Sequence, residues 1–142
     1  MTIGSIEDMK SQNASTKIQI STNTQIPNPK HYDLEERTLQ FAKDAIIFIR
    51  ALPKTTANTE IAKQLIRSAS SVGANYIEAN ESLGKKDFLM RIKICLKEAK
   101  ESAYWLKLIE INSTDSKRLQ ERIIGEALQL VKIFSAILNK SR

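Results

Sequence analysis

Residues 59–83, TEIAKQLIRSASSVGANYIEANESL, decide the fold of this chain. Apolar side chains recur there at steps of three and four residues, which predicts an α-helix with one buried face. These positions are Ile61, Leu65, Ala69, Val72, Tyr76, Ala79 and Leu83. The middle of the segment is made of small residues, namely Ser68, Ala69, Ser70, Ser71, Gly73 and Ala74. Gly73 costs a helix roughly 1 kcal/mol relative to alanine, so we expect close packing to require its missing methyl group. Either Asn58 or Thr59 can cap this helix.

A line of polar residues runs beside this apolar face. Its members are spaced by three or four residues and therefore share one side of the helix: Arg67, Ser71, Asn75 and Glu78, extended by Ser82. A carboxylate beside an apolar face must find hydrogen-bond donors, because burying it alone costs free energy. We therefore expect Arg67, Asn75 and Glu78 to be hydrogen-bonded at helix contacts. We call Arg67, Ser71, Asn75 and Glu78 the polar seam and expect it to be structural rather than catalytic.

The segment before this helix shows the same periodicity. A helix is predicted over about residues 33–51, because Asp33 and Glu36 have the spacing of a capping box and Pro53 ends the helix. Its buried stripe is Leu34, Phe41, Ala45, Phe48, Ile49 and Leu52.

Two more helices follow after short turns. The third is predicted over about residues 85–111, with the stripe Phe88, Ile92, Cys95, Ala99, Ser102, Leu106 and Ile109, widened by Leu89, Leu96 and Ala103. The fourth is predicted over about residues 116–139, with Leu119, Ile123, Ala127, Leu130, Val131, Phe134, Ile137 and Leu138 facing inward. Loops of a few residues leave no connection long enough for a crossover. The sequence therefore predicts an all-α, antiparallel up-down-up-down four-helix bundle.

The chain divides into two predicted parts. Residues 1–31 are rich in Ser, Thr, Asn and Gln, so we expect a flexible polar tail, with an arm that docks on a partner as the alternative. Residues 32–142 are expected to form one bundle domain. No apolar run approaches the roughly 20 residues that a membrane span needs, and we recognise no signal sequence. We expect a cytoplasmic protein with no membrane partner.

Several kinds of catalytic and metal site lack their residues. Di-iron bundles need Glu-x-x-His motifs, and helical ribonucleases of one type need a histidine near an arginine, but His31 is the only histidine and precedes the first helix. The sequence has no Ser/His/Asp set, no glycine-rich phosphate loop and no cysteine pair for zinc. The single cysteine, Cys95, falls on an apolar face, where a reduced structural thiol is expected. We therefore expect no enzyme, no metal and no cofactor.

The net charge of +6 and the isoelectric point near 9.5 allow a nucleic-acid partner without requiring one. On the third helix five lysines fall within an arc of roughly 80°, and Tyr104 lies inside it. This lysine stripe is Lys86, Lys93, Lys97, Lys100 and Lys107. We expect it to bind the phosphates of RNA or DNA, with Tyr104 as a stacking residue. The alternative is a plain solvated face, since Asp87 and Glu101 flank the lysines.

Some apolar residues lie off the predicted stripes. They are Ile46, Ile47, Trp105, Ile124 and Leu128. Surplus apolar surface of this kind marks an interface, and we expect an oligomer that uses Ile47, Trp105 and Leu128. The competing hypothesis is a structural or adaptor protein that binds another protein through the same surface.

Four runs of the chain resemble a known family: LIRSASSVGANYIEA at 65–79, KDF at 86–88, LKEA at 96–99 and YWL at 104–106. The family is the bacterial four helix bundle proteins first noticed as products of intervening sequences in large-subunit rRNA genes. The ordered set behind the resemblance is Arg67, Ser71, Asn75, Glu78, Asp87, Phe88 and Glu98. The chain is also similar, more distantly, to the accessory variability determinant of diversity-generating retroelements.

The resemblance covers roughly residues 33–142 and implies a homopentameric ring with a basic surface. The retroelement relative binds nucleic acid and a reverse transcriptase, so the resemblance implies RNA or DNA and a protein as partners. The polar tail before Asp33 is not part of the family pattern, and only about three consecutive positions match around Tyr104.

Overall fold

The computed structural model of the protein describes residues 34–141, which form four α-helices. They are α2 (Leu34–Arg50), α3 (Thr56–Asn80), α4 (Lys85–Leu108) and α5 (Thr114–Lys140). The described residues contain no strand, and none of their helices has the length and apolar character that crossing a membrane requires. The tail predicted over residues 1–31, the capping role of Asp33 and the position of His31 lie outside the described residues.

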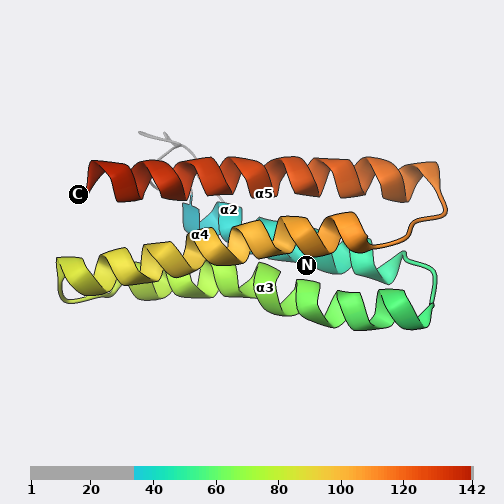
Figure 1. The fold of residues 1–142 in the computed structure, drawn as a ribbon, viewed down its shortest axis with the longest axis horizontal. Helices are drawn as coiled ribbons and strands as arrows, with labels where there is room; N and C mark the ends of the chain where they lie inside the picture. The colour runs from blue at the N-terminus through green and yellow to red at the C-terminus, as the bar shows by residue number, and fades with distance from the viewer. Residues whose placement is uncertain (1–33, 142) are drawn as a thin grey trace, which may run out of the picture. The chain divides into compact units, whose positions relative to one another are not determined.

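Consecutive helices of the bundle lie side by side and are connected at alternating ends (Figure 1). α3 packs against α2 and α4, while α5 packs against α4 and α2, which closes the bundle. The loops comprise residues 51–55, 81–84 and 109–113, and none is long enough for a crossover. The prediction of an all-α four-helix bundle is confirmed.

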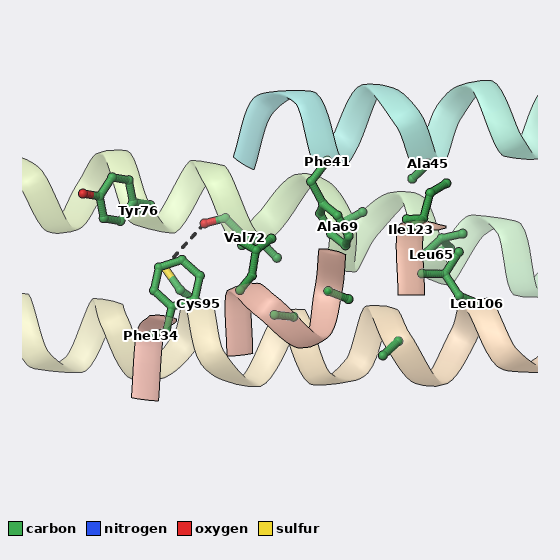
Figure 2. Close-up of a cluster of buried hydrophobic side chains, with 14 of the residues drawn as sticks. Phe41, Ala45, Leu65, Ala69, Val72, Tyr76, Cys95, Leu106, Ile123 and Phe134 are labelled. Carbon is green, nitrogen blue, oxygen red and sulfur yellow. Dashed lines mark hydrogen bonds between the residues drawn. The ribbon is translucent and has the colours of Figure 1, made fainter. Parts of the chain in front are cut away.

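Side chains from all four helices meet in one hydrophobic core (Figure 2). The largest fully buried apolar residues are Phe41, Phe48, Leu65, Val72, Ile92, Leu106, Ile123, Leu130 and Phe134, all of them predicted stripe positions. The ring of Tyr76 lies 6.0 Å from that of Phe134. Ile124, predicted as surplus apolar surface, is partly buried and packs against this core instead, because the apolar face of α5 is wider than the predicted stripe.

The helix ends differ from the predicted ones by up to three residues. Thr55, rather than Asn58 or Thr59, caps α3 by accepting a hydrogen bond from the Asn58 N–H at 3.0 Å. Leu83 lies beyond the last residue of α3 and is fully exposed, so its predicted place on the buried face is wrong. Similarly, α4 ends three residues earlier than predicted, and Ser113 caps α5.

Asn58 joins two loops at one end of the bundle. Its side chain is buried, and its Nδ2 donates to the carbonyl oxygens of Pro53 at 3.2 Å and Glu110 at 2.9 Å. Its Oδ1 accepts from the Glu110 N–H at 3.1 Å. The loop between α2 and α3 is therefore linked, through the Asn58 side chain, to the loop that follows α4.

α2 is attached to α5 by charged side chains. Arg37 donates from Nε and Nη2 to both carboxylate oxygens of Glu126, at 2.6 and 3.0 Å. Arg122 donates to Asp44 at 3.4 Å across the same contact. All four side chains keep some exposure to solvent, so we expect each pair to contribute little to stability.

α2 approaches α3 closely at Gly73. A Cβ atom placed on Gly73 would be 2.9 Å from Oγ1 and 3.2 Å from Cβ of Thr38, which is tighter than real Cβ contacts allow. Thr38 is buried, and its Oγ1 donates to the carbonyl oxygen of Leu34 at 2.7 Å. Its β-branched side chain has little freedom to move aside. The expectation that close packing requires this glycine is confirmed.

We predict opposite effects for two glycine substitutions. Gly73→Ala should lower the free energy of unfolding by up to about 2 kcal/mol, because overpacking against Thr38, at about 1–3 kcal/mol, outweighs the gain of about 1 kcal/mol from the better helix propensity of alanine. Gly125→Ala in α5 is the matched control, since open space surrounds the new methyl group. It should raise the free energy of unfolding by roughly 0.5–1 kcal/mol. Urea denaturation measures the free energy of unfolding of both variants. An equal increase in the two would show that the Thr38 side chain moves aside without cost.

Candidate nucleic-acid interface

The lysine stripe occupies the outer face of α4. This follows from packing, because α4 buries the opposite face, with Ile92, Cys95, Ala99 and Leu106, in the bundle core. Lys86, Lys93, Lys97, Lys100, Lys107 and Tyr104 are all exposed, as predicted for a surface that could meet a ligand. The lysines extend along about six helical turns, or roughly 30 Å.

None of the five lysines forms an ion pair with another residue of the described range. Lys63 and Lys117 do, with Glu60 and Glu121, whereas the other exposed lysines of the described range, at 43, 54, 85, 132 and 140, do not. The stripe is therefore free of short ion pairs within the described bundle, although Lys97 lies close enough to Glu101 to help lower the pKa of its carboxyl.

Glu101, one of the two acidic residues expected to offset the stripe, points toward α3. Its Oε2 accepts hydrogen bonds from Arg67 Nη2 at 2.5 Å and from the indole N–H of Trp105 at 3.2 Å. Partial burial acts to raise the pKa of the Glu101 carboxyl, but the hydrogen bonds from Arg67 and Trp105 and the positive charge nearby outweigh it. The net pKa is lowered, and the charge of Glu101 is paired within the protein. Asp87 remains exposed in the first turn of α4.

Arg67 of the polar seam bridges two carboxylates of α4. Besides Glu101 it binds Glu98, whose Oε1 accepts from Arg67 Nη1 at 3.2 Å. The Glu98 side chain is only 8 % exposed, so Arg67 supplies the cation that a buried carboxylate needs. The hydrogen bond to Glu101 is the main reason that the pKa of Arg67 is raised.

The rest of the polar seam agrees with the prediction except at Glu78. Asn75 donates to the Ser71 carbonyl oxygen at 2.9 Å and accepts from Arg91 Nη1 at 3.1 Å. The expected hydrogen bonding of Arg67 and Asn75 at helix contacts is confirmed. Glu78 is exposed and its side chain has no hydrogen-bond partner among residues 34–141, so the same expectation for Glu78 is wrong within the single chain.

Residues of α4 complete the seam, and sequence reasoning did not assign them to it. They are Arg91, Glu98 and Ser102, whose Oγ lies 2.8 Å from that of the buried Ser68. Their spacings of seven and four residues put all three on one side of α4, next to its apolar stripe. That spacing was a usable signal, since a polar line on one helix needs a polar line on its neighbour.

Cys95 is a buried free thiol beneath this contact. Its Sγ donates to the carbonyl oxygen of Val72 at 3.4 Å, and burial raises its pKa to about 12. A thiol held protonated in this way is a poor nucleophile and metal ligand. Within the described range, no three His, Cys, Asp or Glu side chains are grouped so that they could hold a metal ion.

The three residues predicted at an oligomer interface have different environments. Ile47 and Leu128 are exposed, at 53 % and 46 %. Trp105 is half-buried and packs against the core, with its indole N–H on Glu101. The surface also carries exposed apolar side chains that the prediction did not include, among them Leu39, Ile66 and Ile77.

Comparison with known proteins is consistent with this fold. A family model described as 23S rRNA-intervening sequence protein matches residues 30–140. Among solved structures the chain is similar to a protein from Bacteroides thetaiotaomicron VPI-5482, described as of unknown function and from the S23 ribosomal protein family. The TM-score is 0.65 at 29 % identity, over 74 % of this chain and 97 % of that chain. No curated protein matches. The more distant similarity to the retroelement protein stays a prediction.

We predict that Arg67→Ala lowers the free energy of unfolding by about 1–3 kcal/mol at pH 7, because the buried Glu98 loses its cation. The lowered pKa of Glu101 means that its pairing stabilises the fold above the pKa of an unfolded glutamate, near 4.3, and that this stability is lost as pH falls through the folded pKa. The deficit of the variant should therefore shrink between about pH 5 and pH 3.

Urea denaturation at several pH values measures this deficit. Glu78→Ala is the control, because an exposed carboxylate without a partner in the described range should change stability by less than about 0.5 kcal/mol. A deficit for Arg67→Ala that stays constant with pH would show that lost packing, rather than lost charge pairing, is responsible.

Proposed function

Since the chain belongs to the family of 23S rRNA-intervening sequence proteins, we propose that it is a non-enzymatic, basic, oligomeric four-helix bundle that binds RNA or DNA. Binding takes place in the cytoplasm, through contacts between phosphates and the lysine stripe of α4. The observation that carries the proposal is the gathering of five exposed lysines on the outer face of α4, none of which has an ion-pair partner in the described range.

The position of Glu101 supports this proposal. In the sequence Glu101 offsets the stripe, which favours a plain solvated face. In the folded chain its carboxylate is paired with Arg67 and Trp105, so it repels an approaching phosphate less than a free carboxylate would. Phosphate contacts of this kind give affinity without sequence preference, and each contact releases counterions.

A single stripe binds weakly, so we propose that repetition in an oligomer raises the avidity. The oligomer is a homopentameric ring, as the resemblance of the sequence implies. A ring needs two different surfaces on each subunit, and exposed apolar residues occur on α2, with Ile47, and on α5, with Leu128. Several stripes that bind one ligand together can increase affinity by orders of magnitude.

The combined substitution Lys93→Glu and Lys97→Glu tests the stripe. It should abolish binding to RNA and DNA, as measured by fluorescence anisotropy, because it replaces attraction with repulsion at the centre of the stripe. The binding of the parent protein should itself weaken steeply with added salt. Both lysines are exposed, so helical content and oligomer mass should not change.

The matched control is Lys54→Glu with Lys140→Glu, two exposed lysines that lie in the loop before α3 and at the end of α5. This variant undergoes the same change in net charge on other faces and should bind nearly as well as the parent. Equal loss in both double variants would mean that only net charge matters. Undiminished binding by the Lys93 and Lys97 variant would exclude the stripe as the interface.

Light scattering tests the ring. At micromolar concentration the mass should be that of five 16.0 kDa chains, about 80 kDa. Ile47→Asp should lower this mass, because it puts a charge into an apolar contact. Leu83→Asp is the control, since Leu83 lies in an exposed loop outside the predicted interface, and the mass should stay the same. A monomeric parent protein would refute the oligomer.

A further inference from the structure

Tyr104 is a large aromatic residue in a position where the fold does not require one. It is 57 % exposed and lies on the outer face of α4, one turn from both Lys100 and Lys107. The hydrophobic core does not include it. Phosphate binding does not explain it either, because a phenol ring adds no positive charge.

The Tyr104 ring is restrained by a series of contacts that begins on α3. Its centroid lies 5.0 Å from that of Trp105, in an edge-to-face arrangement with 71° between the ring planes. Trp105 packs against the core and donates its indole N–H to Glu101, which in turn accepts from Arg67. These contacts restrain Trp105, and its ring in turn limits the orientations open to Tyr104 on one side.

We propose that Tyr104 stacks on an unpaired base of the bound strand, and that Trp105, Glu101 and Arg67 are positioning residues for its ring. This inference rests on the proposed function and specifies its ligand: a single strand or loop, rather than a duplex. Bases in a duplex are stacked on one another and cannot turn a face toward the protein, whereas bases of a single strand can. A ring whose orientations are already limited loses less conformational entropy when a base stacks on it.

The arrangement of charge and ring fits a single strand that runs along α4. Lysines lie on both sides of Tyr104 along the helix, so phosphates on either side of the stacked base can be neutralised together. Basic grooves with interspersed aromatic side chains are the usual means of binding single strands without sequence preference.

The experiment measures the affinity of the full-length protein for a fluorescein-labelled single-stranded RNA and for a duplex of the same length. Tyr104→Ala should weaken single-strand binding about tenfold or more and leave duplex binding nearly unchanged. Tyr104→Phe should restore single-strand binding, because phenylalanine keeps the ring. Trp105 is the only tryptophan of the chain and contacts Tyr104, so its fluorescence should change with the single strand and not with the duplex.

Glu101→Ala tests the positioning role, because it removes the oxygen that accepts from the Trp105 indole N–H and from Arg67, whereas glutamine would keep an acceptor. Removing a negative charge beside the lysine stripe should, by electrostatics alone, strengthen the binding of both ligands. If Glu101 holds Trp105, and through it Tyr104, the preference for single strand over duplex should fall at the same time. A preference that stays the same or rises would overturn the positioning role.

Two further results are told apart by the same measurements. If Tyr104→Ala lowers the affinity for both ligands equally, or for neither, the stacking inference is wrong. Phosphate binding by the lysine stripe still stands in that case. If the parent protein binds neither of these ligands, and no DNA in the anisotropy experiment above, the proposed function fails and the stacking inference fails with it. Circular dichroism and light scattering on each variant show that the fold and the oligomer are intact.

Discussion

The close contact between α3 and α4 is the constraint on which the other features depend. Small residues meet along it: the Oγ atoms of Ser68 and Ser102 are 2.8 Å apart, and the Cys95 thiol bonds to a main-chain carbonyl of α3. Helices that approach this closely leave no room between them for long side chains. Arg67 and Glu98 therefore pair along the border of the contact, and the lysines of α4 are left on the side that faces away from the core. One geometric condition accounts for both the polar seam and the lysine stripe.

The buried charge at this border also specifies how the two helices align. Glu98 is nearly inaccessible to solvent and depends on Arg67, so sliding α4 along α3 would leave a carboxylate in the core without its cation. Apolar residues alone would tolerate such a shift better, because packing distinguishes alternative registers less sharply than a charge does. The same alignment brings Glu101 to Arg67 and Trp105, which withdraws a negative charge from the outer face.

Periodicity predicted the four helices and nearly all of the core, because burial imposes a repeat that is visible in the chain itself. It failed where a contact between residues distant in the sequence determines a helix cap or the orientation of a side chain. Thr55, Asn58 and Thr59 are all suitable caps, and the hydrogen bonds of Asn58 to Glu110 leave the capping role to Thr55. Leu83 continues the apolar spacing of α3, but the helix has already ended. The orientation of Glu101 depends on an arginine 34 positions earlier, which no local pattern could indicate.

The hydrogen bonds of Asn58 make the two ends of the bundle unequal. At one end they tie the loop after α2 to the loop after α4, so these segments must come apart together. At the other end, the described hydrogen bonds of the loop 81–84 are local, such as that from Ser82 to the carbonyl oxygen of Ala79. Segments held only by local bonds exchange their amide protons and open to proteases first. We therefore expect the loop 81–84, next to Lys86 of the stripe, to open before the loops at the other end.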